Sequence, residues 1–182
     1  LIHEFENRQI DVLIGTQMIS KGLDFDNVSV VGIMNADAML NFPDFRAYER
    51  AYQLMAQVSG RAGRKNKQGL VIIQTAMPKN KIIEYVVNND YEKMFVSQIN
   101  ERREFNYPPF CRLIMLTLKH KKMYELDRCS ILLADSLRKI FKQRVLGPEY
   151  PIINRIQNYY QKTILIKIEK QKIGRASCRE RV

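Results

Sequence analysis

The chain has 182 residues, enough for one ordinary domain or two small ones, each with a buried core. Hydrophobic residues make up 46% and charged residues 27%, as in globular proteins, and no apolar run is long enough for a membrane span. The formal net charge of +11 favours a polyanionic partner, DNA or RNA, although a solvated basic surface alone would also explain it. No basic and then apolar leader opens the chain, and the spacing of its cysteines favours a reduced protein in the cytoplasm.

The cysteines and the two ends of the chain need separate treatment. Cys111, Cys129 and Cys178 lie far apart, without the paired spacing of a zinc site or a disulfide framework, so we expect reduced, structural cysteines. The chain starts at Leu1, without Met and within a helical pattern, so we expect the true start to lie upstream. Residues 173–182 break the preceding pattern and resemble the translation of a sequencing adapter, so we expect this tail to be non-native.

Residues 1–78 alternate apolar runs with a helical pattern, which is typical of an α/β domain. Asp11–Gly15, Val28–Asn35 and Gly69–Thr75 are β-branched runs that predict strands of a parallel sheet, buried on both faces. Between them, Arg46–Gly60 carries apolar residues at helical spacing. We therefore expect a parallel sheet with flanking helices and functional loops at the strand ends.

A helical linker and a second domain are expected after this unit. Residues 79–109 predict two charged helices, broken near Asp90 as an N-cap, and then a hinge at Pro108–Pro109. Residues 110–172 predict a strand at Cys111–Lys119, a helix at Tyr124–Arg144, a turn at Gly147–Pro148 and a strand at Tyr159–Glu169. This order predicts a small ferredoxin-like α+β domain, truncated before its final helix and strand.

In the segment DVLIGTQMISKGLDF, polar side chains follow directly after a predicted strand. Thr16, Gln17 and Lys21 lie in its loop, and Gly22 permits a tight backbone turn before Asp24. Such a loop suits contacts with phosphate or sugar, which position a nucleic acid without reading its sequence. A loop that merely caps a helix would have the same composition.

The segment QVSGRAGR places two arginines after two glycines at the end of a predicted helix. Arg61 and Arg64 follow Gly60 and Gly63, and Gln57 precedes them by about one helical turn. Arginine is always charged and forks onto phosphate oxygens, so either residue suits an arginine finger on a transferring phosphoryl group. The alternative is a glycine-terminated helix whose basic residues complement its dipole.

Together these segments resemble a known family. The first resembles motif V and the second motif VI of superfamily 2 helicases. The intervening NADAMLNFPDFRAYERAY and the later ERREFNYPPFCRLI and LGP…YYQKTILIKI are similar to the primosomal replication-restart helicases, over residues 1–172. The resemblance implies a second RecA-like lobe that closes on ATP held by a first lobe and moves 3′ to 5′ along single-stranded DNA.

The resemblance also implies roles for individual residues. Arg61 and Arg64 would reach the triphosphate, with Arg64 ranked slightly above Arg61 as the finger, and Gln57 would contact the nucleotide or its attacking water. The sequence does not separate the two arginines. The other implied nucleotide residues are Gly22, Asp24, Gly60 and Gly63, and the implied DNA residues are Thr16, Gln17 and Lys21.

Some family features are absent from this sequence. No phosphate-binding loop and no acidic Walker B strand occur, and neither do the family's paired zinc-binding cysteine clusters. We therefore expect ATP and Mg²⁺ to be held mainly by a missing lobe, Zn²⁺ only in the full-length protein, and no turnover by this fragment alone. The implied partners are single-stranded and forked DNA, single-stranded-DNA-binding protein and other primosome proteins.

Aromatic and basic residues interleave in two further places, where bases could stack and phosphates could pair. They are Arg102, Arg103, Phe105, Tyr107 and Phe110, and then Tyr159, Tyr160, Lys162 and Lys167. Core packing with a solvated face explains them almost as well. The alternative to a helicase motor is a non-catalytic nucleic-acid-binding or assembly module, and another superfamily 2 enzyme fits the PDFRA-x-ER stretch less well.

Overall fold

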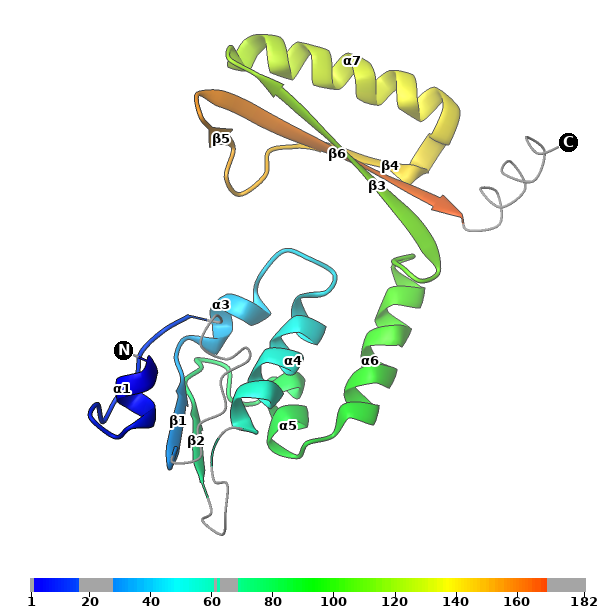
Figure 1. The fold of residues 1–182 in the computed structure, drawn as a ribbon. Helices are drawn as coiled ribbons and strands as arrows, with labels where there is room; N and C mark the ends of the chain where they lie inside the picture. The colour runs from blue at the N-terminus through cyan, green and yellow to red at the C-terminus, as the bar shows by residue number, and fades with distance from the viewer. Residues whose placement is uncertain (1, 17–27, 61, 63–68, 170–182) are drawn as a thin grey trace, which may run out of the picture. The chain divides into compact units, whose positions relative to one another are not determined.

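The computed structural model describes residues 2–16, 28–60, 62 and 69–169, which form two compact units divided between Asn100 and Glu101 (Figure 1). The first unit contains α1 (Ile2–Glu6), β1 (Val30–Ile33), α3 (Ala36–Leu40), α4 (Ala47–Ser59), β2 (Leu70–Ile73), α5 (Lys81–Val87) and most of α6 (Tyr91–Glu104). The second contains β3 (Cys111–His120), α7 (Met123–Phe141), a 3₁₀ turn (Lys142–Arg144), β4 (Val145–Glu149), β5 (Arg155–Ile156) and β6 (Tyr159–Glu169). The expected domain limits at residues 78, 109 and 172 stay a prediction.

The first unit is built on a small parallel sheet. β1 and β2 pair in parallel, with Val30 opposite Leu70 and Ile33 opposite Ile73. α4 packs against β1, α3 and α5. The core therefore forms between one face of the sheet and the helices, and it contains Ile33, Leu40, Ala51, Tyr52, Met55, Ile82, Ile83, Val86 and Met94. These elements confirm the two strands, the long helix and the parallel pairing that the sequence predicts.

Two expectations about this sheet are wrong. Asp11–Gly15 forms no strand, and Val12 and Ile14 are 70% and 88% exposed. β1 and β2 are also not buried on both faces, because Val30 and Ile72 are 55% and 53% exposed. An apolar run favours burial, but a strand also needs a neighbouring strand and a covering layer, and the described residues supply these on one side only.

The predicted helix break between α5 and α6 is confirmed. The Asn80 side chain accepts the N–H of Ile82 at 2.9 Å and begins α5. The Asp90 side chain accepts the N–H of Lys93 at 3.0 Å, and its carboxylate also pairs with the Lys93 ammonium at 2.6 Å. Asp90 is therefore the N-cap of α6, as the sequence predicts.

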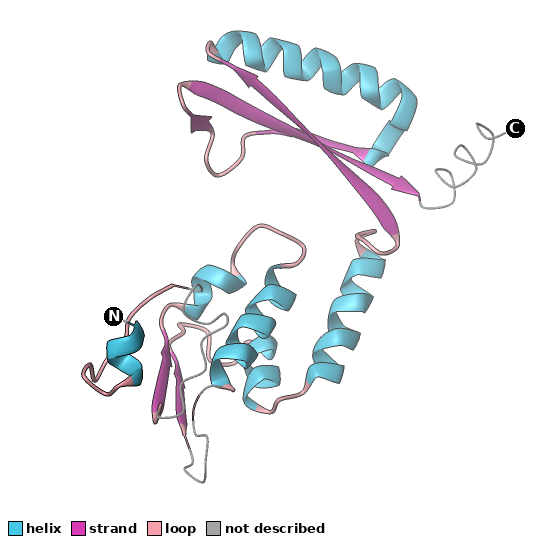
Figure 2. Cartoon of the chain, viewed as in Figure 1, coloured by secondary structure: helices cyan, strands magenta, loops and turns pink. Residues whose placement is uncertain are grey.

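The second unit is an antiparallel sheet covered on one face by α7 (Figure 2). Its strand order is β3–β6–β4, and β5 pairs with the start of β6. Ala134 of α7 packs against Val145, Ile164 and Ile166. Alternate residues of β6 reach this core, as expected for a strand with one covered face.

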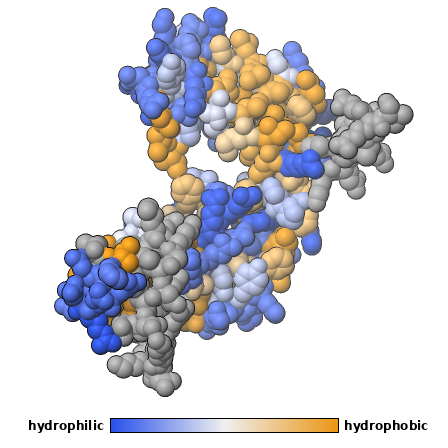
Figure 3. All heavy atoms as spheres, viewed as in Figure 1, coloured by the Kyte–Doolittle hydropathy of each residue, from blue (hydrophilic) through white to orange (hydrophobic). Residues whose placement is uncertain are grey.

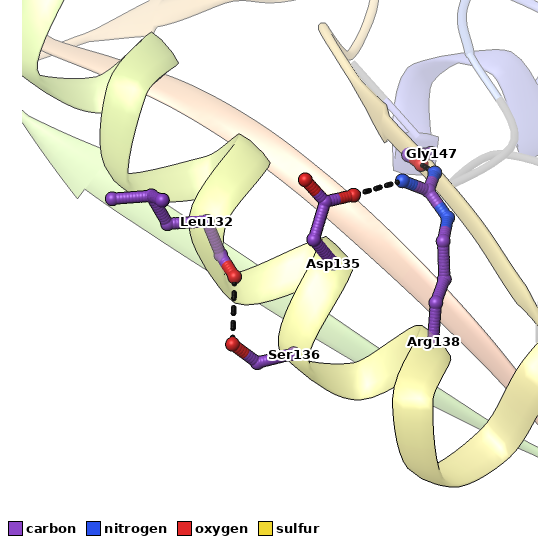
Figure 4. Close-up of polar contacts among 5 residues, drawn as sticks. All are labelled: Leu132, Asp135, Ser136, Arg138 and Gly147. Carbon is purple, nitrogen blue, oxygen red and sulfur yellow. Dashed lines mark hydrogen bonds and ion pairs between the residues drawn. The ribbon is translucent and has the colours of Figure 1, made fainter.

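The predicted turn at Gly147–Pro148 is wrong, because both residues lie within β4. Proline is tolerated at sheet edges and bulges, and the β4 register shifts between Leu146 and Glu149. β4 is also tied to the end of α7: Arg138 donates to the carbonyl oxygen of Gly147 and pairs with Asp135 at 2.9 Å (Figure 4). A Gly-Pro pair is thus compatible with a strand where side chains from a covering helix complete its hydrogen bonds.

Candidate nucleotide and nucleic-acid interface

The two motif segments lead into neighbouring strands at one edge of the parallel sheet. Residues 17–27 precede β1, and residues 63–68 precede β2. The N–H of Leu70 donates to the carbonyl oxygen of Ser29 at 2.9 Å, directly before the paired residues Val30 and Leu70. The structure therefore brings together the points where the two segments enter the sheet.

Most of the predicted site residues lie outside the described part of the chain. They are Gln17, Lys21, Gly22, Asp24, Arg61, Gly63 and Arg64. Of the others, Thr16 is exposed in a segment without regular structure, and Gln57 is exposed in the last turn of α4. The assignment of roles to these residues stays a prediction.

Gly60 ends α4 in an ordinary helical conformation, with φ −67° and ψ −3°. Its N–H donates to the carbonyl oxygen of Ala56 at 3.0 Å, and the N–H of Ala62 donates to Ser59 at 3.2 Å. A Cβ atom at Gly60 would lie 3.6 Å from the Ala56 oxygen, which is normal van der Waals contact. The backbone therefore does not require glycine at this position.

The PDFRA stretch fixes the start of the helix that carries Gln57. The Asp44 side chain accepts the N–H of Arg46 at 2.9 Å, and its carbonyl oxygen accepts the N–H of Ala47 at 2.8 Å. The same carboxylate pairs with Arg50, one turn into α4, at 2.8 Å. Sequence reasoning singled out this stretch as a family signature but missed its local role, which the Asp-x-Arg spacing of an Asx-turn could have indicated.

A second aspartate joins the loops at the other edge of the parallel sheet. The Thr75 hydroxyl donates to one Asp37 carboxylate oxygen at 2.6 Å, and the Ala76 N–H donates to the other at 2.7 Å. These two hydrogen bonds lower the pKa of Asp37. Nearby, the N–H of Asn35 donates to the Gln74 side-chain oxygen at 3.1 Å, so the loops after β1 and β2 are held together. Sequence reasoning missed this pairing because its partners are separated by 38 and 39 positions.

The net positive charge is confined to one half of the chain. Residues 1–100 contain 11 basic residues (Lys and Arg) and 11 acidic residues. Residues 101–182 contain 19 basic residues and 8 acidic residues. The whole excess of +11 therefore belongs to the part of the chain that holds the second unit. A polyanion would be attracted to that part.

Two of the interleaved basic residues, Lys162 and Lys167, are engaged within the second unit. The Lys162 side chain is buried, and its ammonium pairs with Asp127 at 2.7 Å. Lys167 donates to the carbonyl oxygen of Phe105 at 2.7 Å, and its Nζ lies 4.1 Å from the centre of the Tyr107 ring. These two cations therefore hold the second unit together.

The described residues offer no candidate metal site. Among them, no group of three His, Cys, Asp or Glu side chains could hold a metal ion. The Cys111 thiol donates to the carbonyl oxygen of Asn106 at 2.8 Å, and burial raises its pKa. Within the same residues, every helix is too short or too polar to cross a membrane.

Comparison with known proteins assigns a domain family to a part of each unit. Residues 1–66 match the helicase conserved C-terminal domain, and residues 103–180 match the primosomal protein N C-terminal domain. The replication restart protein PriA of Bacillus subtilis (strain 168) is 38% identical over 177 residues, which cover 94% of this chain and 22% of that protein. The replication restart protein PriA of Borreliella burgdorferi is 34% identical over 166 residues, which cover 90% of this chain and 25% of that protein.

A third relative extends the similarity to another bacterial group. The replication restart protein PriA of Synechocystis is 37% identical over 169 residues, which cover 92% of this chain and 20% of that protein. The chain spans about a fifth to a quarter of the length of these relatives. The two domains in this order, with similarity along nearly the whole chain, show that it belongs to the PriA family of replication restart proteins, as a part of such a protein.

Proposed function

We propose that this chain is part of an ATP-dependent 3′–5′ DNA helicase that binds stalled or forked DNA and restarts replication by primosome assembly. The observation that carries the proposal is the hydrogen bond between Leu70 and Ser29, which joins the starts of the two strands that follow the motif segments, in a chain of this family. One segment would contact DNA and the other the nucleotide, so adjacent entry points would couple the two ligands.

The end of α4 fits a nucleotide only with help from the arginines that follow it. The carboxyl end of a helix carries partial negative charge, which repels a triphosphate. Arg61 and Arg64 would reverse that sign, and the exposed Gln57 amide can donate to the nucleotide or its attacking water. Gly22, Asp24, Gly60 and Gly63 would shape the surrounding loops. ATP would supply the phosphoryl transfer, with its Mg²⁺ held mainly by parts of the protein outside this chain.

DNA contact is proposed for both units. Thr16, Gln17 and Lys21 would hold the strand near the nucleotide, and the basic second half would add contacts with phosphate. We also propose that the first unit belongs to a second RecA-like lobe, because its parallel strands have flanking helices. The second would be a ferredoxin-like domain, because β3 and β4 both run antiparallel to β6 around the β3–α7–β4 connection.

Other partners follow from the proposed role. Single-stranded-DNA-binding protein and further primosome proteins would assemble with the whole protein at forked DNA in the cytoplasm. A Zn²⁺ ion is expected only in the whole protein, as the family resemblance implies, because the paired cysteine clusters that would hold it do not occur in this sequence.

The test is to assay the 182-residue chain alone for ATP turnover and for DNA binding. We expect background turnover with excess forked DNA, because the phosphate-binding loop is absent, and weak binding without sequence preference. The affinity should fall with salt, with a log–log slope of about −0.7 per phosphate contact on single strands. Turnover that follows the chain through purification and vanishes in Arg64→Ala would contradict the proposed division of labour, and salt-independent affinity would contradict the DNA contact.

A further inference from the structure

Cations and aromatic rings lie together at one end of the second unit, on two stretches of sequence that contain no acidic residue. β3 ends there at His120, and β6 begins there at Tyr159. Residues 117–124 and 150–163 contain no Asp or Glu. Figure 3 shows hydrophilic residues gathered at the end of this unit where β3 gives way to α7.

The strand register brings these residues together. His120 of β3 pairs with Tyr160 of β6, and Arg155 of β5 pairs with Tyr160 on the other side. The Arg155 guanidinium carbon lies 5.0 Å from the centre of the Tyr160 ring. Lys121 makes a similar contact, with its Nζ 5.6 Å from the centre of the Tyr159 ring. Tyr159 is 40% exposed, and Lys119, Lys121, Lys122 and Arg155 are all exposed.

We propose that this basic tip, formed by Lys119, Lys121, Lys122, Arg155, Tyr159 and Tyr160, is a binding site for single-stranded nucleic acid. Its cations would pair with phosphates, and its tyrosine rings would stack on bases without reading their sequence. The proposal rests on the DNA-binding role proposed above and assigns a surface to it.

Several cations elsewhere on the described part of this unit have acidic neighbours. Arg103, whose guanidinium carbon lies 5.1 Å from the centre of the Phe110 ring, stands between Glu101 and Glu104 in sequence. The cations of α7 stand among acidic residues, with Arg128 beside Asp127 in sequence and Arg138 paired with Asp135. At the other end of the sheet, Arg144 pairs with Glu169 at 2.5 Å. The cations of the basic tip have no such carboxylate partner in the described structure, so their charge is available to a phosphate.

A lipid surface is the competing partner, because Ile152 and Ile153 are 75% and 64% exposed near β5. Exposed isoleucines beside lysines suit an anionic membrane. The two tyrosine rings, each beside a cation, favour nucleic acid, because a ring with a cation on one face can stack on a base with the other.

The experiment measures binding of the 182-residue chain to a fluorescent oligothymidine by anisotropy, over a range of salt. The test variant is Lys119→Gln with Lys121→Gln and Arg155→Gln. Its matched control is Arg112→Gln with Arg128→Gln and Lys139→Gln, three exposed cations of the same unit without a described ion pair. We expect the test variant to lose about ten-fold or more in affinity and the magnitude of its salt slope to fall by about 2, at about 0.7 per contact. The control should stay within about three-fold.

A second pair of variants isolates stacking. Tyr159→Leu should lose about five-fold or more in affinity with an unchanged salt slope, whereas Tyr159→Phe should bind like the parent. Circular dichroism checks that each variant is folded. If the triple variant is unfolded, the single variant Lys119→Gln replaces it in the measurement of affinity against salt concentration, because the Lys119 side chain is exposed.

The outcomes separate this inference from the proposed function. Equal losses in the test and control variants would overturn the basic tip and leave DNA binding in place. No binding by the parent chain would overturn the proposed DNA contact of this chain and the basic tip with it. Tighter binding to phosphatidylserine vesicles than to oligothymidine, abolished by the test variant, would assign the surface to lipid instead.

Discussion

Lys162 is a charged side chain on the face of β6 that α7 covers, and the residue is only 8% exposed. Asp127 of α7 accepts from its ammonium at 2.7 Å and from the Tyr150 hydroxyl at 2.5 Å. The Lys162 Nζ also lies 4.6 Å from the centre of the Tyr150 ring. One carboxylate thus joins a helix, a strand and the loop after β4. Without it, a lysine would be left buried and unpaired, which is strongly unfavourable.

This group predicts a stability that falls at both ends of the pH range. Hydrogen bonds from Lys162 and Tyr150 lower the pKa of Asp127, so its contribution is complete above the ordinary carboxyl range and is lost as pH falls through the lowered value. Burial, with the hydrogen bond to Asp127, raises the pKa of Tyr150 to about 12. Its contribution is therefore complete below about pH 10 and is lost as pH rises from there towards 12.

Urea unfolding followed by circular dichroism checks this prediction. Tyr150→Phe should flatten the alkaline loss of stability and keep the acid loss, whereas Asp127→Asn should flatten the acid loss. Because every other titrating group is common to the variants and the parent, the differences isolate these two residues. Identical alkaline curves for the parent and Tyr150→Phe would contradict the assignment.

At the scale of elements, α4 depends on Asp44 at its start and carries the candidate nucleotide residues at its end. Asp44→Ala removes the hydrogen bond to the Arg46 N–H and the ion pair with Arg50. We expect it to lower the free energy of unfolding by about 1 kcal/mol. Asp44→Asn keeps the acceptor for the N–H and loses only an exposed ion pair, so it should cost less than about 0.5 kcal/mol. Equal losses in the two variants, measured by urea unfolding, would show that the turn does not depend on this hydrogen bond.

The edge strand β4 depends on the backbone of Gly147. Its φ of +90° disfavours any other residue, and a Cβ atom there would lie 2.8 Å from the carbonyl oxygen of Thr163. Gly147→Ala should therefore lower the free energy of unfolding by about 2 kcal/mol or more. Gly32→Ala is the control, because nothing lies within 4 Å of a Cβ atom at that position of β1. A melting temperature of Gly147→Ala equal to that of the control would contradict the described backbone of β4.

The sequence locates elements better than it locates their partners. The run of Val, Ile and Leu at Gly69–Thr75 predicts β2, but a similar run at Asp11–Gly15 forms no strand because pairing is a tertiary property. Periodicity predicts α7, and its apolar residues are divided: Leu126 is buried, whereas Leu133 and Ile140 are 37% and 72% exposed. The other buried residues of α7 are small, Ser130 and Ala134, since the helix lies close to the sheet there.

In the candidate site, too, local patterns can be predicted from the sequence, but contacts between distant residues cannot. A motif is a local pattern, so Gln57 and its neighbours can be named from sequence alone. Asp37 cannot, because its partners Thr75 and Ala76 are brought to it only by the parallel pairing of β1 and β2. The buried pairing of Lys162 with Asp127 is hidden for the same reason, and the sequence alone leaves both DNA contact and core packing open for this lysine.

At the scale of the whole molecule, charge and motifs are segregated. The first hundred residues hold both helicase motif segments and carry no net charge, whereas the remaining residues carry the whole excess. A long-range attraction for DNA would therefore act mainly on the second half, and the motif segments would act on a strand already held nearby. In the proposed function, coupling of nucleotide and DNA would then depend on the first unit, and retention of DNA would depend on the second.

The most direct test of the central claim is Arg64→Ala in the longer protein that contains this chain, with ATP turnover and DNA affinity measured on the same preparation. An arginine finger acts on charge that develops in the transition state. We therefore expect turnover to fall by about 10² to 10⁵, with DNA affinity within a few-fold of the parent. Arg128→Ala, at an exposed cation of α7, should leave both quantities unchanged. If Arg64→Ala instead loses DNA affinity and keeps its turnover, the arginines belong to the DNA-binding surface and the proposed motor site is wrong.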